Sequence, residues 1–187
     1  ELPIGAGKKF LNQSPVLGRV LGGWGASGVL TYAQGLPLPI GGGSPNPIFN
    51  NRTRPNLVPG VNQKLYKGGK FNPYTDRYVN PTAFSDAGPY VLGNAPPALP
   101  QLRGFLFSNE SLSLLKNTKI RAKTNLTLRI DMFNAFNRVV FGNPNMDFNQ
   151  VSCTTPSEDG ACNGAFGKVS SQANAPRQVQ FAVRLSF

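Results

Sequence analysis

The 187-residue sequence has no histidine, only two cysteines and only 8 acidic residues. Without histidine, Ser-His and Cys-His catalysis, histidine-containing metal sites and histidine pH switching are excluded. Two cysteines cannot form a four-thiolate zinc site. The sequence therefore predicts no catalytic residues, no metal site and no cofactor, and we expect a protein that is not an enzyme.

Positive charge is in excess, with 19 basic residues and a formal net charge of +11. Such a balance permits binding to nucleic acid, anionic lipid or an anionic ligand. The basic residues are scattered, and the densest group is Lys116, Lys119, Arg121 and Lys123. Because no basic helix or RNP-like aromatic motif accompanies them, we expect no nucleic-acid partner.

No signal peptide and no run of 18 apolar residues is present, so a membrane-spanning helix is not predicted. Glu1 is not an initiator methionine, and we expect the chain to be a fragment or a processed piece. A missing signal peptide then says nothing about the compartment.

The last ten residues, from Gln178, alternate without a break between apolar and polar side chains. This period of two is typical of a β-strand, and its length fits a strand that crosses an outer membrane as well as a half-buried soluble strand. The apolar positions are Val179, Phe181, Val183, Leu185 and Phe187, and the polar-face positions are Gln178, Gln180, Ala182, Arg184 and Ser186.

Three earlier segments, at about 23–34, 105–116 and 124–136, alternate in the same way. Their apolar positions are Trp24, Ala26, Gly28, Leu30 and Tyr32, then Leu106, Leu112 and Leu114, then Leu126, Leu128, Ile130 and Met132. The polar positions of the last segment are Asn125, Thr127, Arg129 and Asp131.

Two details of these segments bear on their surroundings. Trp24 and Tyr32 stand near opposite ends of one strand, as aromatic residues do at the two membrane interfaces. Glu110 interrupts an apolar face, and it lies either at headgroup level or at a bulge that turns it inward.

The connections alternate in length, with a short turn before Thr124 and two long Gly-, Pro- and Asn-rich segments at 35–104 and 138–176. A compact soluble domain seldom contains structureless loops of this length, whereas a barrel has short turns on one rim and long loops on the other. The predicted fold class is all-β, an antiparallel meander of about four long strands from a transmembrane β-barrel, with two long external loops.

Cys153 and Cys162 fall within the second long loop. In an oxidising exterior they form a disulfide that closes a small ring, and in a reducing compartment they stay as two thiols. The barrel interpretation favours the disulfide.

Arg129, Asp131 and Arg184 all point to the polar face, which is the lumen of a barrel. They form either a structural salt bridge between strands, the simpler interpretation, or a charge network that touches a plug or a solute. Either way, we predict that Asp131 lies within reach of Arg129 or Arg184.

Six basic residues lie in the first long loop. They either contact lipopolysaccharide phosphates or serve as solubilising charges, and the sequence does not decide between the two. They are Arg52, Arg54, Lys64, Lys67, Lys70 and Arg77.

The order of several short motifs resembles the late strands of TonB-dependent outer-membrane receptors, in particular the Oar-like group with a carboxypeptidase-regulatory-like N-terminal domain. The matching segments are residues 1–10, 21–28, 54–60, 80–84, 111–117, 131–137, 141–145 and 176–181, with the terminal Phe187.

This resemblance implies that residues 1–187 form the C-terminal part of a receptor barrel whose plug and earlier strands are missing. The last strand, from Val179 to Phe187, would carry the signal read by the barrel-assembly machinery. Residues 1–21 and the turn at 116–123 would then be periplasmic. The implied partners are outer-membrane lipid, lipopolysaccharide, that machinery and, through the missing part, the TonB complex.

Two other classes stay open from the residues alone. A soluble β-sandwich binding module, for a glycan or another surface ligand, is the main alternative, and an enzyme fragment is the weaker one. In a sandwich the apolar faces of two sheets pack against each other across a core.

Overall fold

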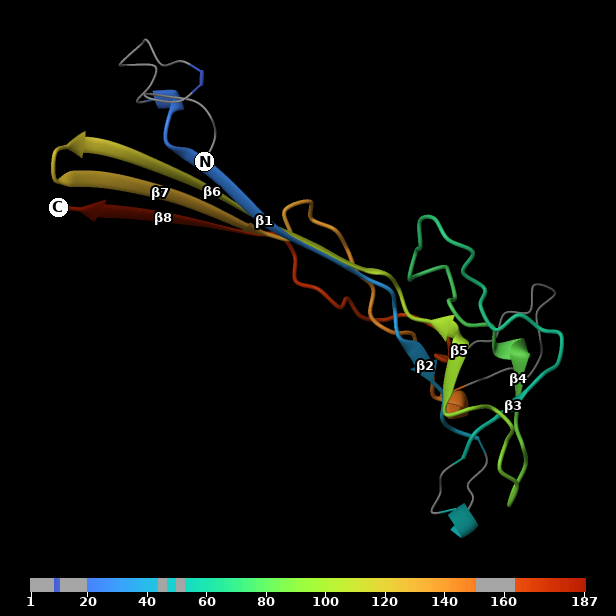
Figure 1. The fold of residues 1–187 in the computed structure, drawn as a ribbon. Helices are drawn as coiled ribbons and strands as arrows, with labels where there is room; N and C mark the ends of the chain where they lie inside the picture. The colour runs from blue at the N-terminus through green and yellow to red at the C-terminus, as the bar shows by residue number, and fades with distance from the viewer. Residues whose placement is uncertain (1–8, 11–19, 44–46, 50–52, 151–163) are drawn as a thin grey trace. The chain divides into compact units, whose positions relative to one another are not determined.

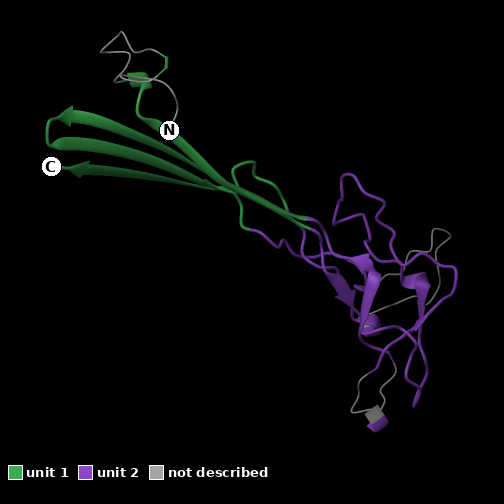
Figure 2. Cartoon of the chain, in the orientation of Figure 1, with its two compact units in different colours: residues 1–33, 107–139, 175–187 green, residues 34–106, 140–174 purple. Residues whose placement is uncertain are grey.

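The computed structural model describes residues 9–10, 20–43, 47–49, 53–150 and 164–187, and its regular structure is almost entirely β (Figure 1). The chain divides into two compact units, coloured separately in Figure 2. Unit 1 comprises residues 1–33, 107–139 and 175–187, and unit 2 comprises residues 34–106 and 140–174. Among the described residues, no helix is long and apolar enough to cross a membrane.

Unit 1 contains one four-stranded sheet in which every neighbouring pair is antiparallel. The strand order is β1-β6-β7-β8, so each strand pairs with the next long strand along the chain (Figure 1). The predicted all-β antiparallel meander is thereby confirmed. The strands are β1 (Trp24–Ala33), β6 (Phe107–Arg121), β7 (Thr124–Phe133) and β8 (Gln178–Ser186).

Two predicted strand ends were wrong. β6 continues to Arg121, because Thr118 still pairs with Leu126 and keeps the ladder intact beyond Lys116. β7 ends at Phe133 because Asn134 adopts a φ of 48°, a left-handed conformation that breaks the pleat.

The cross-strand register assigns each side chain to one of two faces, since directly opposed residues share a face. We call these the apolar face and the polar face. The apolar face carries Trp24, Ala26, Gly28, Leu30 and Tyr32 of β1, Leu112 and Leu114 of β6, Leu126, Leu128, Ile130 and Met132 of β7, and Val179, Phe181, Val183 and Leu185 of β8. Leu106, predicted to join it, precedes β6 and belongs to unit 2.

Unit 2 is built from the two long segments that the sequence presented as structureless connections, and that expectation was wrong. It holds two short antiparallel sheets, β2-β5 and β3-β4. The elements are β2 (Pro37–Pro39), β3 (Asn56–Leu57), β4 (Phe84–Ser85) and β5 (Ala98–Arg103), with 3-10 turns η1 (Pro47–Phe49), η2 (Pro81–Ala83) and η3 (Phe148–Gln150).

A hydrophobic core holds unit 2 together, and both long segments supply it. Phe166 is fully buried, with its ring centroid 5.4 Å from that of Phe84 and 5.6 Å from that of Phe148. The buried cluster contains Leu38, Ile40, Phe71, Tyr78, Val79, Ala83, Phe84, Ala95, Leu99, Leu102, Phe148, Phe166 and Val169.

Backbone hydrogen bonds join the two long segments within unit 2. The amides of Tyr78 and Val79 both donate to the carbonyl of Gly167, at 2.9 and 3.3 Å. Gly167 has a φ of 76°, and a Cβ there would lie 2.7 Å from the carbonyl oxygen of Val79. Only glycine therefore fits this contact without strain.

We predict that Phe166→Ala destabilises unit 2 by about 3–5 kcal/mol, since it removes a buried ring from the centre of the core. Limited proteolysis and thermal unfolding of the protein in detergent measure the effect. Tyr74→Ala is the matched control, because Tyr74 lies in the same unit with 96% of its side chain exposed. Equal protease resistance of the two variants would contradict this role for the core.

Candidate functional site

The apolar face of unit 1 is exposed. Phe181 and Val183 of β8 are each 72% exposed, and Leu30 of β1 is 59% exposed. Among the described residues of unit 1, no second sheet or helix packs over this face. In water, such a row is unfavourable by about 1.5–3 kcal/mol for each large apolar side chain.

Near one end of the apolar face, one row inside Leu126 and Leu185, lies a lysine that is held in place. The Lys116 ammonium nitrogen lies 4.8 Å from the Trp24 ring centroid and donates hydrogen bonds to the carbonyls of Val20 and Gly22. An amphipathic lysine beside tryptophan is typical of a membrane–water interface, where the stem stays apolar and the head stays polar.

Near the other end lies an ion pair between a buried carboxylate and a half-exposed arginine. The Glu110 side chain is fully buried, with one carboxylate oxygen 2.8 Å from Nε of Arg138. The same oxygen accepts a 2.9 Å hydrogen bond from the Tyr32 hydroxyl. Glu110 stays in register opposite Leu30, so it lies on the apolar face without a bulge, and the inward-turning alternative was wrong.

A turn after β7 covers this ion pair. The amide of Ala135 donates to the Glu110 carbonyl at 2.8 Å. The side chain of Asn134, itself buried, donates to the carbonyls of Arg138 and Ala175 and accepts from the Arg138 amide. The sequence did not predict Arg138 as the partner of Glu110, nor Asn134 as the residue that holds Arg138.

The lengths of the strands, rather than the spacing of these two polar residues, fit a membrane. Glu110 and Lys116 are six residues apart on β6, which corresponds to about 20 Å along an extended strand. The apolar band of outer-membrane barrels is about 25 Å tall. β1 and β7 have 10 residues each and β8 has 9, which is the length of a tilted membrane-crossing strand.

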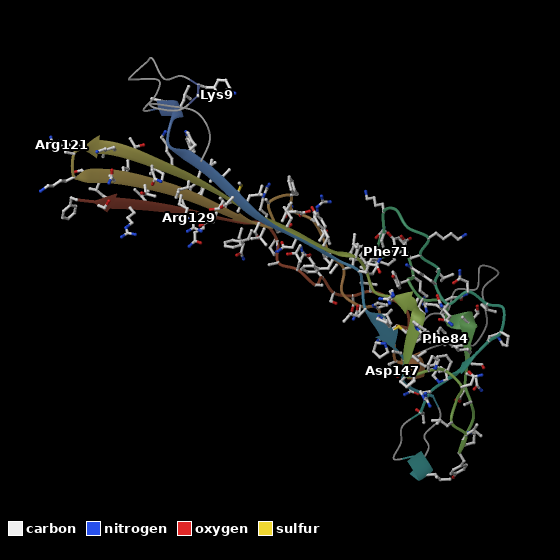
Figure 3. The ribbon with its side chains drawn as sticks, in the orientation of Figure 1. Lys9, Phe71, Phe84, Arg121, Arg129 and Asp147 are labelled. Carbon is white, nitrogen blue, oxygen red and sulfur yellow. The ribbon has the colours of Figure 1, made fainter. Side chains whose placement is uncertain are left out.

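The polar face carries the predicted charge pair. Arg129 Nε lies 2.9 Å from Asp131, and the Ser113 hydroxyl also donates to this carboxylate. The prediction that Asp131 lies within salt-bridge reach of Arg129 or Arg184 is confirmed, with Arg129 as the partner. Figure 3 labels Arg129 on β7.

The other predicted polar residues follow the same register. Gln180 lies opposite Asp131, Arg184 opposite Thr127, and Asn125 opposite Ser186. Gln178 pairs with Phe133 at the far end of β8. Thus one face collects the whole predicted polar set.

Three of the six basic residues of the first long loop, Arg54, Lys64 and Arg77, make structural contacts. Arg54 donates to the carbonyl of Ala95, and Arg77 donates to the carbonyls of Phe166 and Gly164. Burial lowers the pKa of the Arg77 guanidinium, which still carries its charge at neutral pH. Lys64 lies over the rings of Tyr66 and Tyr78.

The remaining predicted residues of the long loops make no contact of this kind among the described residues. Lys67 and Lys70 are exposed. Arg52, Cys153 and Cys162 lie outside the described residues, so the disulfide stays a prediction. Within the described ranges, no three acidic or cysteine side chains cluster as a metal site would require.

A single sheet with one exposed apolar face, with polar contacts near both ends, defines a membrane-crossing segment rather than half of a soluble sandwich. A family model described as an outer membrane beta barrel domain matches residues 1–180. The chain belongs to this family and is located in the bacterial outer membrane. No curated protein matches the chain, and no solved structure matches it.

We predict that Arg138→Met destabilises the protein by about 3–5 kcal/mol, because it leaves the Glu110 carboxylate buried without its counter-charge. Urea unfolding in detergent or lipid measures the change. The double variant Glu110→Gln/Arg138→Met should recover most of the loss, and Arg121→Met near the turn should have little effect. A double variant less stable than Arg138→Met would show that the charge pair is not the cause.

Proposed function

We propose that the chain is the C-terminal barrel portion of a TonB-dependent receptor of the Oar-like group, which takes up a solute across the outer membrane. It is not an enzyme in this proposal. The observation that carries it is the amphipathic sheet of unit 1, whose polar face bears hydrogen-bonding and charged side chains in every strand pair.

The polar face is suited to line a lumen. Ser113, Asp131 and Arg129 satisfy one another on it, and Thr127 donates to the side chain of Asn117 at 2.8 Å. Such contacts keep charged and amide groups hydrogen-bonded in a space that water and a solute share. The apolar face then contacts outer-membrane lipid.

Unit 2 is suited to act as the external part. Two long loops that share one core give a stable surface, unlike loops that move independently. Of the basic loop residues, Lys67 and Lys70 are the candidates for lipopolysaccharide phosphates. Loss of co-purified lipopolysaccharide from a Lys67→Gln/Lys70→Gln variant tests that partner.

The TonB assignment is tested by cross-linking. The full-length protein, purified in detergent, should form a cross-linked complex with the periplasmic domain of TonB. An unrelated outer-membrane porin serves as the negative control. If the two proteins cross-link to the same low extent, the TonB-dependent part of the proposal is wrong, while the barrel assignment stands.

The last strand is proposed to carry the barrel-assembly signal. We predict that deletion of Phe187, which is 97% exposed, lowers the amount of protein in the outer membrane several-fold. Heat-modifiable mobility in electrophoresis of outer-membrane fractions measures it, with Tyr74→Ala as the control. Unchanged assembly without Phe187 would exclude a role for the terminal ring.

A further inference from the structure

The polar face of unit 1 carries charge mainly of one sign. Within β1, β6, β7 and β8, its charged residues up to the register shift near the β6–β7 turn are Lys119, Arg129, Arg184 and Asp131. Three cations therefore face a single carboxylate.

The register places the three cations in one area of the polar face. Arg129 lies opposite Ala182, Arg184 lies opposite Thr127, and Lys119 lies opposite Asn125, so they occupy three successive cross-strand rows. Arg129 and Arg184 are diagonal neighbours, which on one face of a sheet are about 7–8 Å apart. The long side chains of Arg129 and Arg184 can reach a common ligand, and Lys119 lies two rows from Arg129 on the neighbouring strand. We call Lys119, Arg129 and Arg184 the cationic patch.

The one carboxylate does not balance the patch. Asp131 is engaged by Arg129 and Ser113. Among the described residues, no carboxylate forms an ion pair with Lys119 or Arg184, and both residues are exposed. Like charges close together on one face destabilise a sheet, so an uncompensated cluster favours the binding of an anion.

Unmatched positive charge is not a general property of the sheet, as the apolar face shows. Lys116 lies on the same strand as Lys119 but on the apolar face, where backbone carbonyls and the Trp24 ring occupy it. The Lys116 ammonium group thus has acceptors around it, whereas the charges of the cationic patch exceed the one carboxylate beside them.

We propose that the cationic patch binds the carboxylate or phosphate groups of an anionic solute that passes along the polar face. This proposal rests on the proposed function and gives the class of solute. Guanidinium groups match carboxylate and phosphate oxygens in pairs, and such charge-assisted hydrogen bonds are the strong ones.

Isothermal titration of the full-length protein in detergent at low salt tests the proposal, with citrate and tripolyphosphate as probes and sucrose as the neutral control. Both anions should bind, more weakly as salt is added. Arg184→Gln and Lys119→Gln should each weaken binding roughly tenfold. Arg184→Lys should recover part of the loss, and Lys116→Gln, which removes the same charge from the other face, should change nothing.

Several outcomes would overturn the proposal. One is no anion binding, and another is an equal loss in Lys116→Gln, which would indicate only bulk charge. A third is a cross-link between an Arg184→Cys variant and an acidic segment of the protein itself in the absence of solute, since the patch would then hold protein. Anion binding without TonB cross-linking would support the anion site and contradict the receptor assignment. TonB cross-linking without anion binding would support the receptor assignment and contradict the anion site.

Discussion

The structure of unit 1 depends on the solvation of its apolar face. Strand pairing satisfies the backbone groups between neighbours, and the pleat sends most of the large apolar side chains of the sheet to one uncovered side. Only hydrocarbon makes that arrangement favourable. In hydrocarbon, however, the outer edges of β1 and β8 also need partners, because no water can pair their backbone groups. The exposed apolar face and the need for further strands beside β1 and β8 therefore both follow from the same hydrocarbon surroundings.

On both faces of the sheet, a carboxylate is paired with an arginine and accepts a hydrogen bond from a hydroxyl group. Glu110 has an arginine and the hydroxyl of Tyr32, and Asp131 has an arginine and the hydroxyl of Ser113. The difference is in exposure. The Glu110 carboxylate is fully buried under the turn at Asn134, where removing its partner leaves a buried charge, whereas the Asp131 side chain is 17% exposed. The two arginines are similarly exposed, Arg138 at 50% and Arg129 at 56%. A structural pair and a site for function are therefore distinguished by their surroundings, not by their residue types.

The sequence was sufficient for the sheet, because a period of two is a local signal that survives in any surroundings. It identified the face of each strand and the Arg129–Asp131 pair, which lie two residues apart. The sequence did not predict the core of unit 2. That core joins residues far apart in the chain, such as Phe84 and Phe166, and no periodicity indicates their contact. The sequence also did not predict the ion pair between Glu110 and Arg138. Arg138 follows a left-handed turn at Asn134, and no regular residue spacing connects it with Glu110.

Unit 2 also explains part of the excess of positive charge. Its few ladder hydrogen bonds leave carbonyls to be satisfied otherwise, and arginines supply the donors: Arg54 to Ala95, Arg77 to Phe166 and Arg103 to Gly35. A guanidinium suits this task, since it presents several donors in one plane. Basic residues in the loops are therefore no guide to an anionic partner by themselves. The cations of the polar face are different, because within the described residues neither Lys119 nor Arg184 forms an ion pair or serves a loop carbonyl in this way.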